Sequence, residues 1–425
     1  MLKEVQNRGP QVLAGQPHGP AAVITRRAAD RLRAGHLWVY SSDVASLIPH
    51  SDTSEIAPGA LVTVVDSRGI PLGTALYSAA SQITLRMVSA EPSLTRTAYL
   101  EQLHERISAA LALRNELAPT SATDNSYRLI FSEADNLPGI VADRYNDLVI
   151  LQLLTQGTAQ DDVRHILADV LRERLQPASI VERPDPQIRE LEQLAPAPSA
   201  PLYTSTPDSP QLTTVFTING LHFHYDASSG QKTGAFLDQR LNYAAAARYA
   251  HGTALDICTY QGGFALHLAQ RCDRVTGVDA SRAALVVADR NLQLNPTLYA
   301  QVDWIEADAF ELLREYEATG QQFDTIVLDP PAFAKSKRAA EGAMRGYKEL
   351  NLRAMKLLRS GGTLVTCSCS HHVSLADFTD VVAAAASDAA RRVQLLETRG
   401  AAPDHPAVLT LPETSYLKCL ICRVD

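Results

Sequence analysis

The stretch Thr253-Ala-Leu-Asp-Ile-Cys-Thr-Tyr-Gln-Gly-Gly-Phe264 decides the fold of the C-terminal half of this 425-residue chain. It opens with a short apolar run, which is typical of a strand buried on both faces in a parallel sheet. The run breaks at Gly262-Gly263 into a helical stretch, and a second strand over 274–279 ends in an acid 23 residues beyond Asp256. This order of strand, glycine turn, helix, strand and acid predicts a nucleotide-binding βαβ unit, in which the terminal acid binds ribose hydroxyls.

The glycine turn lacks the G-x-G-x-x-G pattern, which disfavours a dinucleotide site, and its form resembles the first half of an S-adenosylmethionine methyltransferase. Strands alternate with helices from there to the end of the chain, which predicts an α/β fold with a parallel, Rossmann-like sheet and right-handed crossovers. The strands expected in this sheet cover residues 254–257, 275–278, 303–306, 325–328, 363–366 and 417–422.

The composition is that of a globular protein, with 46% hydrophobic residues and a net charge of −8. No apolar run approaches the roughly 20 residues that span a bilayer, and residues 1–20 lack the apolar core of a signal peptide. We therefore expect a cytoplasmic protein without membrane contact, whose six cysteines stay reduced. The net charge argues against indiscriminate nucleic-acid binding, although a local basic patch is compatible with it.

The chain divides into four predicted segments. Residues 1–20 read as a flexible N-terminus, 21–95 as a mainly β domain, 96–213 as a small central α/β domain with a Pro- and Ser-rich linker, and 214–425 as the Rossmann-like domain.

The N-terminal β domain carries candidate RNA-binding side chains. A small barrel that presents Arg31, Arg33 and Trp38 would suit RNA, because cations meet phosphates and aromatic rings stack on bases. The alternative is that Trp38 only fills the interior of the barrel.

In an open parallel sheet the ligand lies beyond the carboxyl ends of the strands. Polar residues follow five successive strands of the predicted sheet, and they are Asp256, Asp279, Asp308, Asp329 and the pair Cys367/Cys369. Any single acid among them could simply cap a helix, but five strand ends together predict one crevice. There Asp279 would take ribose hydroxyls, Asp308 with Ala309 would meet the adenine, and Gly262 would let the backbone approach the methionine part of the cofactor.

The loop Asp329-Pro-Pro-Ala-Phe333 directly follows a predicted strand. Pro330 and Pro331 fix a rigid loop that aims an acid and an aromatic ring at the ligand. The alternative is a plain turn that ends the strand.

The stretch Thr366-Cys-Ser-Cys-Ser370 offers a nucleophile. Methylation at C5 of a pyrimidine needs help, and a thiolate that adds to C6 pushes electrons to C5. An extended backbone points Cys367 and Cys369 to one side, and Cys369 lies further past the strand end, so it reaches further into the crevice. The alternatives are that Cys367 attacks, or that both cysteines are small buried apolar residues.

Further motifs match one family in order along the chain. They are Glu133-Ala-Asp-Asn-Leu-Pro-Gly139, Lys232-Thr-Gly-Ala-Phe-Leu-Asp-Gln-Arg240, Gly262-Gly-Phe264, Asp329-Pro-Pro-Ala-Phe333, Arg345-Gly-Tyr-Lys348, Ser368-Cys-Ser370, Asp404-His-Pro406 and Pro412-Glu-Thr-Ser-Tyr-Leu-Lys418. On these motifs the chain resembles the bacterial 23S rRNA cytosine-5 methyltransferases of the large-subunit methyltransferase I type.

The resemblance implies an RNA-binding PUA domain at the N-terminus, a central α/β domain and a class I methyltransferase domain that uses S-adenosylmethionine. It implies 23S ribosomal RNA as the partner, Cys369 as the nucleophile, and Asp329 with Pro330, Pro331 and Phe333 around the target base. It leaves open a homodimer and the base that removes the C5 proton, and residues 182–193 are less basic than is usual in the family. The residues predicted to bind the cofactor, including those already named, are Lys232, Thr233, Gly234, Phe236, Asp238, Gln239, Asp256, Cys258, Tyr260, Gly262, Asp279, Ala280, Ser281, Asp308, Ala309 and Asp329.

Two other functions use the same residues. An amino-group methyltransferase could use Asp329 to hold an exocyclic amine, in which case Cys369 would be incidental, and a non-catalytic assembly factor could bind cofactor and RNA without turnover. No metal site is predicted, because Cys419-Leu-Ile-Cys422 falls in an apolar strand without a second ligand pair nearby.

Overall fold

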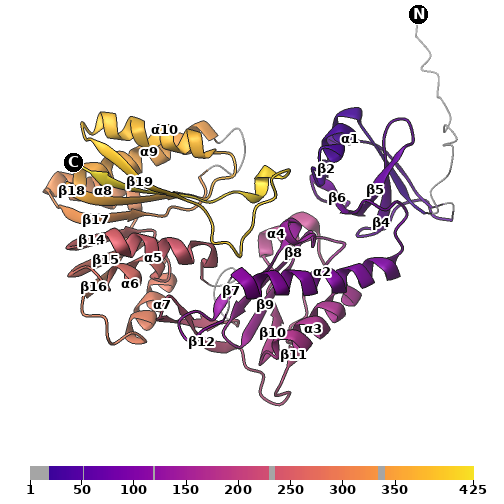
Figure 1. Ribbon diagram of the computed structural model, residues 1–425, viewed down its shortest axis with the longest axis horizontal. Coiled ribbons are helices and arrows are strands. Elements are labelled where there is room, and N and C mark those ends of the chain that lie inside the picture. The colour runs from indigo at the N-terminus through magenta and orange to yellow at the C-terminus, as the bar shows by residue number, and fades with distance from the viewer. Residues whose placement is uncertain (1–18, 51, 118–119, 229–234, 334–339) are drawn as a thin grey trace, which may run out of the picture.

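The computed structural model describes residues 19–50, 52–117, 120–228, 235–333 and 340–425 (Figure 1). Three units follow one another along the chain, each built on its own sheet. None of the helices in these ranges is long and apolar enough to cross a membrane.

The N-terminal unit is a six-stranded, barrel-like sheet with one helix packed on it (Figure 1). Its elements are β1 (Ala21–Ile24), α1 (Arg26–Arg33), β2 (Trp38–Tyr40), β3 (Val44–Ile48), β4 (Leu61–Val65), β5 (Pro71–Tyr77) and β6 (Ile83–Ser89). The strand order is β2-β6-β5-β4-β1-β3. Thr25 caps α1 by accepting a hydrogen bond from the backbone of Ala28. Buried aliphatic residues of β1, β4, β5 and β6 pack against Ala28 and Ala29 of the helix.

The central unit places two long helices on a five-stranded sheet of order β11-β10-β9-β8-β7. Its elements are α2 (Arg96–Leu117), β7 (Ser126–Phe131), β8 (Ile140–Tyr145), β9 (Leu148–Leu153), α3 (Asp161–Leu175), β10 (Ser179–Glu182), α4 (Pro186–Glu192) and β11 (Tyr203–Thr204). Leu103 and Ile107 of α2 and Leu167 of α3 lie in one buried cluster with the sheet.

A hairpin of β12 (Thr213–Ile218) and β13 (Leu221–Asp226) follows, and it joins the central unit to the C-terminal unit. Tyr145 of β8 stacks on Tyr225 with ring centroids 4.3 Å apart. The same buried cluster contains Phe216 of the hairpin and Phe264 of the C-terminal unit. Because this core is shared, the hairpin fixes the central sheet against the C-terminal one.

The C-terminal unit is a seven-stranded sheet of order β16-β15-β14-β17-β18-β20-β19 with helices on both faces. Its elements are α5 (Arg240–Tyr249), β14 (Thr253–Ile257), α6 (Gly263–Leu268), β15 (Arg274–Asp279), α7 (Arg282–Gln293), β16 (Gln301–Glu306), α8 (Ala309–Thr319), β17 (Phe323–Leu328), α9 (Ala340–Leu357), β18 (Leu358–Ser368), α10 (Leu375–Asp388), β19 (Val393–Arg399) and β20 (Lys418–Val424). Helices α5–α7 cover one face and α8–α10 the other (Figure 1).

The expected strands are all present, but the sheet is mixed rather than parallel throughout. β14 to β18 run parallel, whereas β20 runs antiparallel to both β18 and β19. β20 returns from β19 by a loop, without a crossover helix, and this is why its direction reverses. β19 was not expected, because its exposed residues show no apolar alternation.

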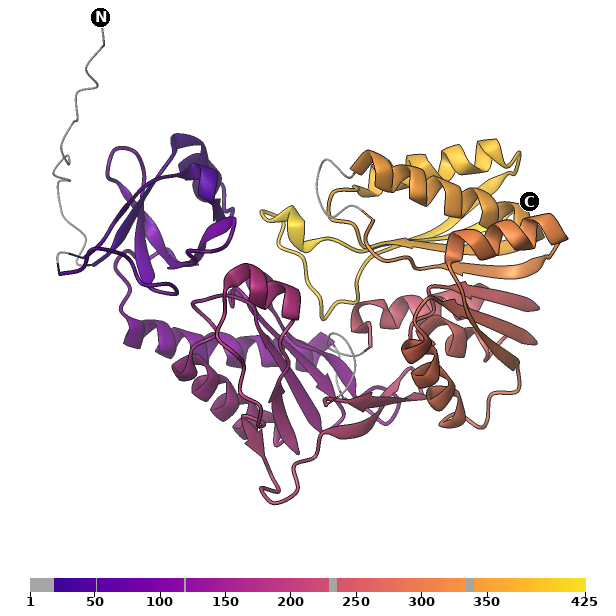
Figure 2. The same cartoon turned by 180° about the vertical axis from the view of Figure 1, so that it is seen from behind.

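The loop over 400–417, between β19 and β20, extends from the C-terminal sheet toward the other two units (Figures 1 and 2). Asp404 in this loop accepts a hydrogen bond from the backbone of Arg128 in β7 at 2.8 Å. Further along, Glu413 lies 3.9 Å from the Nε2 atom of His36 in the N-terminal unit. This loop therefore contacts all three units.

Candidate active site

Four of the predicted strand-end residues lie along the carboxyl ends of the parallel strands in the C-terminal sheet, and this end of the sheet is called the active-site edge below. Asp279 ends β15, Asp256 lies in β14, Asp329 follows β17 and Cys369 follows β18. In the strand order these are four consecutive strands, so the outer two are separated by three strand spacings, or about 14 Å. One half of the edge, at β14 and β15, is acidic, and the other half carries the thiol.

The loop after β14 has an unusual backbone. Cys258 and Tyr260 adopt φ angles of +65° and +52°, and Gly262 has +85°. Residues with side chains rarely adopt this left-handed conformation, which is concentrated at ligand-binding turns. A Cβ atom on Gly263 would lie 2.6 Å from the ring of Tyr243, so only glycine lets α5 and α6 approach this closely.

This backbone conformation directs the amide of Tyr260 at Asp279, and the amide of Ser281, two residues after Asp279, is directed at it as well. Its carboxylate oxygens accept hydrogen bonds from the backbone of Tyr260 and of Ser281, each at 2.9 Å. The carboxylate is thereby held at the strand end, in the position that binds ribose hydroxyls in nucleotide-binding sheets.

Asp256 is fully buried beneath the same loop. Its Oδ2 atom accepts from the hydroxyl of Thr259 at 2.5 Å and from the backbone of Ala265 at 2.9 Å. Its Oδ1 atom is buried and has no hydrogen-bond partner in the described structure. Burial raises the pKa of Asp256 to about 7, against the effect of the two hydrogen bonds. An unpartnered buried acceptor of this kind suits a donor group on a bound ligand.

A pocket opens above this loop, and its walls combine aromatic and polar groups. The rings of Phe236 and Tyr260 lie 5.1 Å apart. The pocket is lined by Ile218, Phe223, Ala235, Phe236, Tyr243, Cys258, Thr259, Tyr260, Gln261, Gly263, Phe264 and Asp329. Burial raises the pKa of Cys258, so this thiol stays protonated. Two of the lining residues, Thr259 and Tyr260, donate hydrogen bonds to Asp256 and Asp279, so the pocket adjoins the acids of β14 and β15. Aromatic walls next to these carboxylates suit a cofactor that contains a nucleoside.

The other residues predicted to contact the cofactor are less uniform in their placement. Asp308 is exposed, and its Oδ1 atom caps α8 by accepting from Phe310 and Glu311 at 2.9 and 3.0 Å, so its role as an N-cap is realised. Ser281 likewise caps α7, next to the exposed Ala280, while Ala309 begins α8. The predicted contacts at Lys232, Thr233 and Gly234 lie outside the described residues.

In the thiol half of the edge, the two candidate cysteines differ in how far they are buried. Cys367 is completely buried and faces Cys419 across the β18–β20 pair. Cys369 lies past the end of β18 and is partly exposed, with its sulfur 3.9 Å from the carbonyl oxygen of Pro330. Burial raises the pKa of Cys367 well above its usual value. Cys369 is therefore the cysteine of this pair that can reach a substrate.

Asp329 lies between the thiol and the cofactor pocket. Its Oδ1 atom accepts from the side-chain amide of Gln239 at 3.0 Å. Loss of solvent, with the negative charges of Asp238 and Asp256 nearby, raises the pKa of Asp329 to about 8. The carboxyl group is therefore largely protonated at neutral pH and can donate as well as accept.

The segment over 236–240 contacts the thiol half as well as the cofactor pocket. Asp238, predicted to touch the cofactor, accepts a 2.5 Å hydrogen bond from the hydroxyl of Tyr416 in the 400–417 loop. Gln239 holds Asp329, and Phe236 lines the pocket. This segment therefore links the two halves of the site.

In the loop after Asp329, the ring of Phe333 packs on Tyr347 of α9 with centroids 4.8 Å apart. Pro330 is buried and Pro331 is exposed. The loop thus rests against α9, and its first residues flank Cys369.

Lys418 is a site residue for which no role was predicted from the sequence. It begins β20, is 6% exposed, and donates hydrogen bonds from Nζ to the carbonyl oxygens of Ser370 and Tyr416, both at 2.7 Å. The available signal was a lysine directly before the apolar run Cys419-Leu-Ile-Cys422.

The three candidate RNA-binding residues of the N-terminal unit have partners within the protein. Arg31 pairs with Asp43 at 2.5 Å, and Arg33 pairs with Asp66 at 2.6 Å. Trp38 does not fill the interior of the barrel, because its indole N–H donates to a carboxylate of the central unit.

That carboxylate is Glu133, which accepts from Nε1 of Trp38 at 2.7 Å and from Arg86 at 3.0 Å. The guanidinium group of Arg86 also lies over the indole ring, 5.6 Å from its centre. Trp38 therefore fixes the N-terminal unit to the central unit, while its part in RNA binding stays a prediction.

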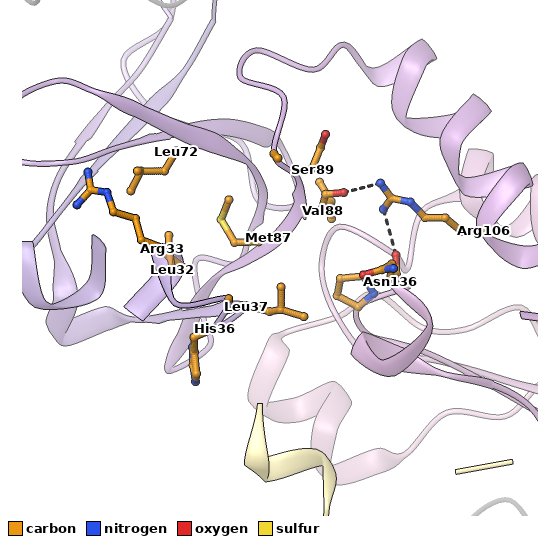
Figure 3. A pocket seen from close by; sticks show the side chains of 13 residues that line it. Leu32, Arg33, His36, Leu37, Leu72, Met87, Val88, Ser89, Arg106 and Asn136 are labelled. Atoms are coloured by element: carbon orange, nitrogen blue, oxygen red, sulfur yellow. Dashed lines mark hydrogen bonds between the residues drawn. The ribbon is translucent and has the colours of Figure 1, made fainter. Parts of the chain in front are cut away.

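A cavity of about 410 Å³ lies between the same two units (Figure 3). Arg106 of α2 lines it and donates to the carbonyl oxygens of Val88 and Asn136 at 2.5 and 3.0 Å. The cavity contains none of the strand-end residues, so it is separate from the active-site edge.

The fold and this edge define a class I methyltransferase, and comparisons with known proteins agree. A family model for S-adenosylmethionine-dependent methyltransferases matches residues 162–423, and one for PUA-like domains matches residues 23–90. The domain therefore uses S-adenosylmethionine, which the pocket and the acids of β14 and β15 fit.

The names of similar curated proteins are more specific than the descriptions of the two family models. Ribosomal RNA large subunit methyltransferase I of Erwinia tasmaniensis is 38% identical over 95% of this chain and 98% of that protein. The Escherichia coli protein of the same name is 36% identical over the same shares. A solved structure of a methyltransferase complexed with S-adenosylhomocysteine superposes with a TM-score of 0.77 over 94% of this chain and 99% of that chain. A structure of an S-adenosylmethionine-dependent methyltransferase from Streptococcus mutans superposes equally well, and at 18% identity both show the fold alone. The chain belongs to the ribosomal RNA large subunit methyltransferase I family.

Proposed function

We propose that this protein methylates C5 of a cytosine in 23S ribosomal RNA, and that the thiol of Cys369 forms a transient bond to C6 of that cytosine. One observation carries the proposal: the partly exposed sulfur of Cys369 lies on the same sheet edge as the cofactor acids, beside the loop that follows Asp329. The names of the relatives support large-subunit ribosomal RNA as the substrate.

The chemistry follows from the position of the sulfur. The Cys369 thiolate adds to C6, and the electron pair of the C5–C6 double bond moves to C5, which becomes nucleophilic. S-adenosylmethionine supplies the electrophilic methyl group. Loss of the C5 proton to a base, with departure of the thiolate, restores the double bond and frees Cys369.

Asp329 would hold the target base. Since its pKa is raised to about 8, its carboxyl group can donate a proton to N3 of cytosine while its other oxygen accepts from the exocyclic amine. Gln239 orients this carboxyl group, and Pro330, Pro331 and Phe333 shape the slot around the base.

The target base must leave its stack to reach this edge, as with other enzymes that act on a base. The N-terminal PUA-like domain, with Arg31, Arg33 and Trp38, would then bind neighbouring RNA. The domain boundaries at 20, 95 and 213, the remaining predicted cofactor contacts, and a cytoplasmic location belong to the same proposal.

Transfer of a labelled methyl group tests the proposal. Large-subunit RNA from cells lacking the protein is incubated with tritiated S-adenosylmethionine, and the labelled nucleoside is identified after digestion. Wild-type protein should yield 5-methylcytidine, Cys369→Ala should lose at least about a thousandfold in turnover, and the matched variant Cys367→Ala should stay within a few fold. Full turnover by Cys369→Ala would instead indicate an amino-group methyltransferase, and no transfer by wild-type protein would indicate a binding factor.

A further inference from the structure

Lys418 is a buried lysine, and a buried ammonium group is stabilised by a negative charge nearby. It is 6% exposed, and in the β18–β20 pairing it lies opposite Ser368, the residue before Cys369. Removing an ammonium group from water costs several kcal/mol unless hydrogen bonds and an opposite charge compensate. Within the ranges that the structure describes, no carboxylate forms an ion pair with Lys418.

Hydrogen bonds hold its ammonium group against the backbone next to Cys369. Two of its three N–H donors are directed at the carbonyl oxygens of Ser370 and Tyr416, both at 2.7 Å. Ser370 directly follows Cys369, so the first of these bonds ties the ammonium group to the peptide that carries the nucleophile. Burial lowers the pKa of Lys418 to about 8, and interaction with Cys369 acts in the opposite direction.

Three other titratable groups around this corner are neutral near pH 7. Tyr347 of α9 lies with its hydroxyl 2.9 Å from Ser370 Oγ, and burial raises its pKa. Burial also raises the pKa of Tyr416 and lowers that of His371. None of the three can therefore balance a thiolate.

The charged groups nearby are committed to other partners. Arg128, which faces Tyr416, is paired with Asp143 at 2.8 Å. Asp238 accepts from Tyr416, and Asp329 is largely protonated. Among the residues that the structure describes, Lys418 is thus a cation placed to act on the thiol.

We propose that Lys418 is the positioning residue that keeps Cys369 ionised, by holding a buried ammonium group next to its sulfur. This inference deepens the proposed function and depends on it for its catalytic consequence. The proton of the thiol leaves to solvent and Lys418 neither gains nor loses a proton in the reaction. Near pH 7 its ammonium group is largely charged, and this charge stabilises the thiolate before attack and again when the thiolate leaves C6. Ionisation of Cys369 can be measured without RNA or cofactor.

The experiment measures alkylation of Cys369 by iodoacetamide in the full-length protein between pH 5 and 10, with the modified peptide quantified by mass spectrometry. A free cysteine ionises with a pKa of about 8.5, so wild-type protein should show a rate midpoint below that pH. Lys418→Met should raise the midpoint and slow alkylation at pH 7.5 about tenfold, whereas Lys418→Arg, which keeps the charge, should retain most of the rate. Circular dichroism confirms that each variant is folded.

A wild-type midpoint at or above pH 8.5 would overturn the inference without any variant, even if Lys418→Met failed to fold. An unchanged profile in folded Lys418→Met would overturn it as well. These outcomes are independent of methyl transfer: full turnover by Cys369→Ala would remove the proposed reaction but leave the alkylation result standing.

Discussion

The two halves of the active-site edge are built from very different spans of sequence. The cofactor half at β14 and β15 uses Asp256, the loop after it and Asp279, all within one short βαβ unit. The thiol half combines residues from β17, β18 and β20, the segment over 236–240 and the 400–417 loop. Gln239 and Asp329, which share a hydrogen bond, are 90 residues apart. The first half is therefore a local property of the chain, whereas the second depends on the assembled fold.

The largest expected effect concerns the loop that assembles the thiol half. Asp404 is fully buried and accepts from Arg240 at 3.1 Å as well as from the backbone of Arg128. Asp404→Ala leaves Arg240 buried without its partner, so the free energy of unfolding should fall by about 3 kcal/mol. Chemical denaturation measures this, with the exposed Asp273→Ala as a control. An equal stability of both variants would contradict a structural role for Asp404.

The same residue predicts a pH dependence. Burial alone would raise the pKa of Asp404, but His405, Arg240 and the backbone of Arg128 hold it below its usual value. Since the folded-state pKa is depressed, the stabilisation is present above the unfolded-state value of about 3.9 and is lost as pH falls below it. The difference between wild-type and Asp404→Ala should therefore narrow toward pH 2, when both are measured by denaturation across that range.

The next effect isolates the cofactor half. Asp279→Ala removes the carboxylate predicted to bind ribose hydroxyls, so affinity for S-adenosylmethionine should fall by about 2 kcal/mol, or roughly thirtyfold. Isothermal titration calorimetry measures the loss, and Asp303→Ala on the neighbouring strand β16 is the matched control. Alkylation of Cys369 should not change in either variant. A shift in that alkylation would show that the two halves are not separable.

A smaller effect concerns Asp329. Its folded-state pKa of about 8 lies above the unfolded-state value, so ionisation destabilises the fold progressively as pH rises from about 4 to 8. Asp329→Asn should therefore raise the melting temperature at pH 8.5 more than at pH 4.5, while it lowers turnover. An equal shift of the melting temperature at both pH values would mean that the fold does not raise the pKa of this carboxyl group.

The smallest effect lies furthest from the sheet edge. Trp38→Phe removes the hydrogen bond to Glu133, worth about 1 kcal/mol. We expect the KM for RNA to rise severalfold with kcat unchanged, because the bond orients the N-terminal unit and touches no reacting atom. A fall in kcat alone would contradict this assignment.

How well a feature can be predicted from the sequence depends on whether it belongs to the local cofactor half or to the assembled thiol half. The sequence predicted β14, β15 and their acids because the strands are continuously apolar and the glycine turn is local. It favoured Cys369 over Cys367 as the nucleophile because Cys369 lies beyond the strand end, and that choice stays a prediction, although Cys369 is the more exposed of the two. It could not reveal the antiparallel β20, the bond between Asp238 and Tyr416, or the place of Lys418, because each depends on pairing between distant segments. Trp38 shows the same limit: its partner Glu133 is 95 residues away.

The central claim is a covalent bond between Cys369 and C6 of a cytosine, and trapping that bond tests it most directly. A large-subunit RNA fragment that contains 5-fluorocytidine has no proton to lose from C5 after methylation, so the enzyme cannot be released. With S-adenosylmethionine present, mass spectrometry should find the methylated nucleotide attached to Cys369, and no complex should form with Cys369→Ala. Methylation of ordinary RNA without any trapped complex, or attachment at a different residue, would contradict the account.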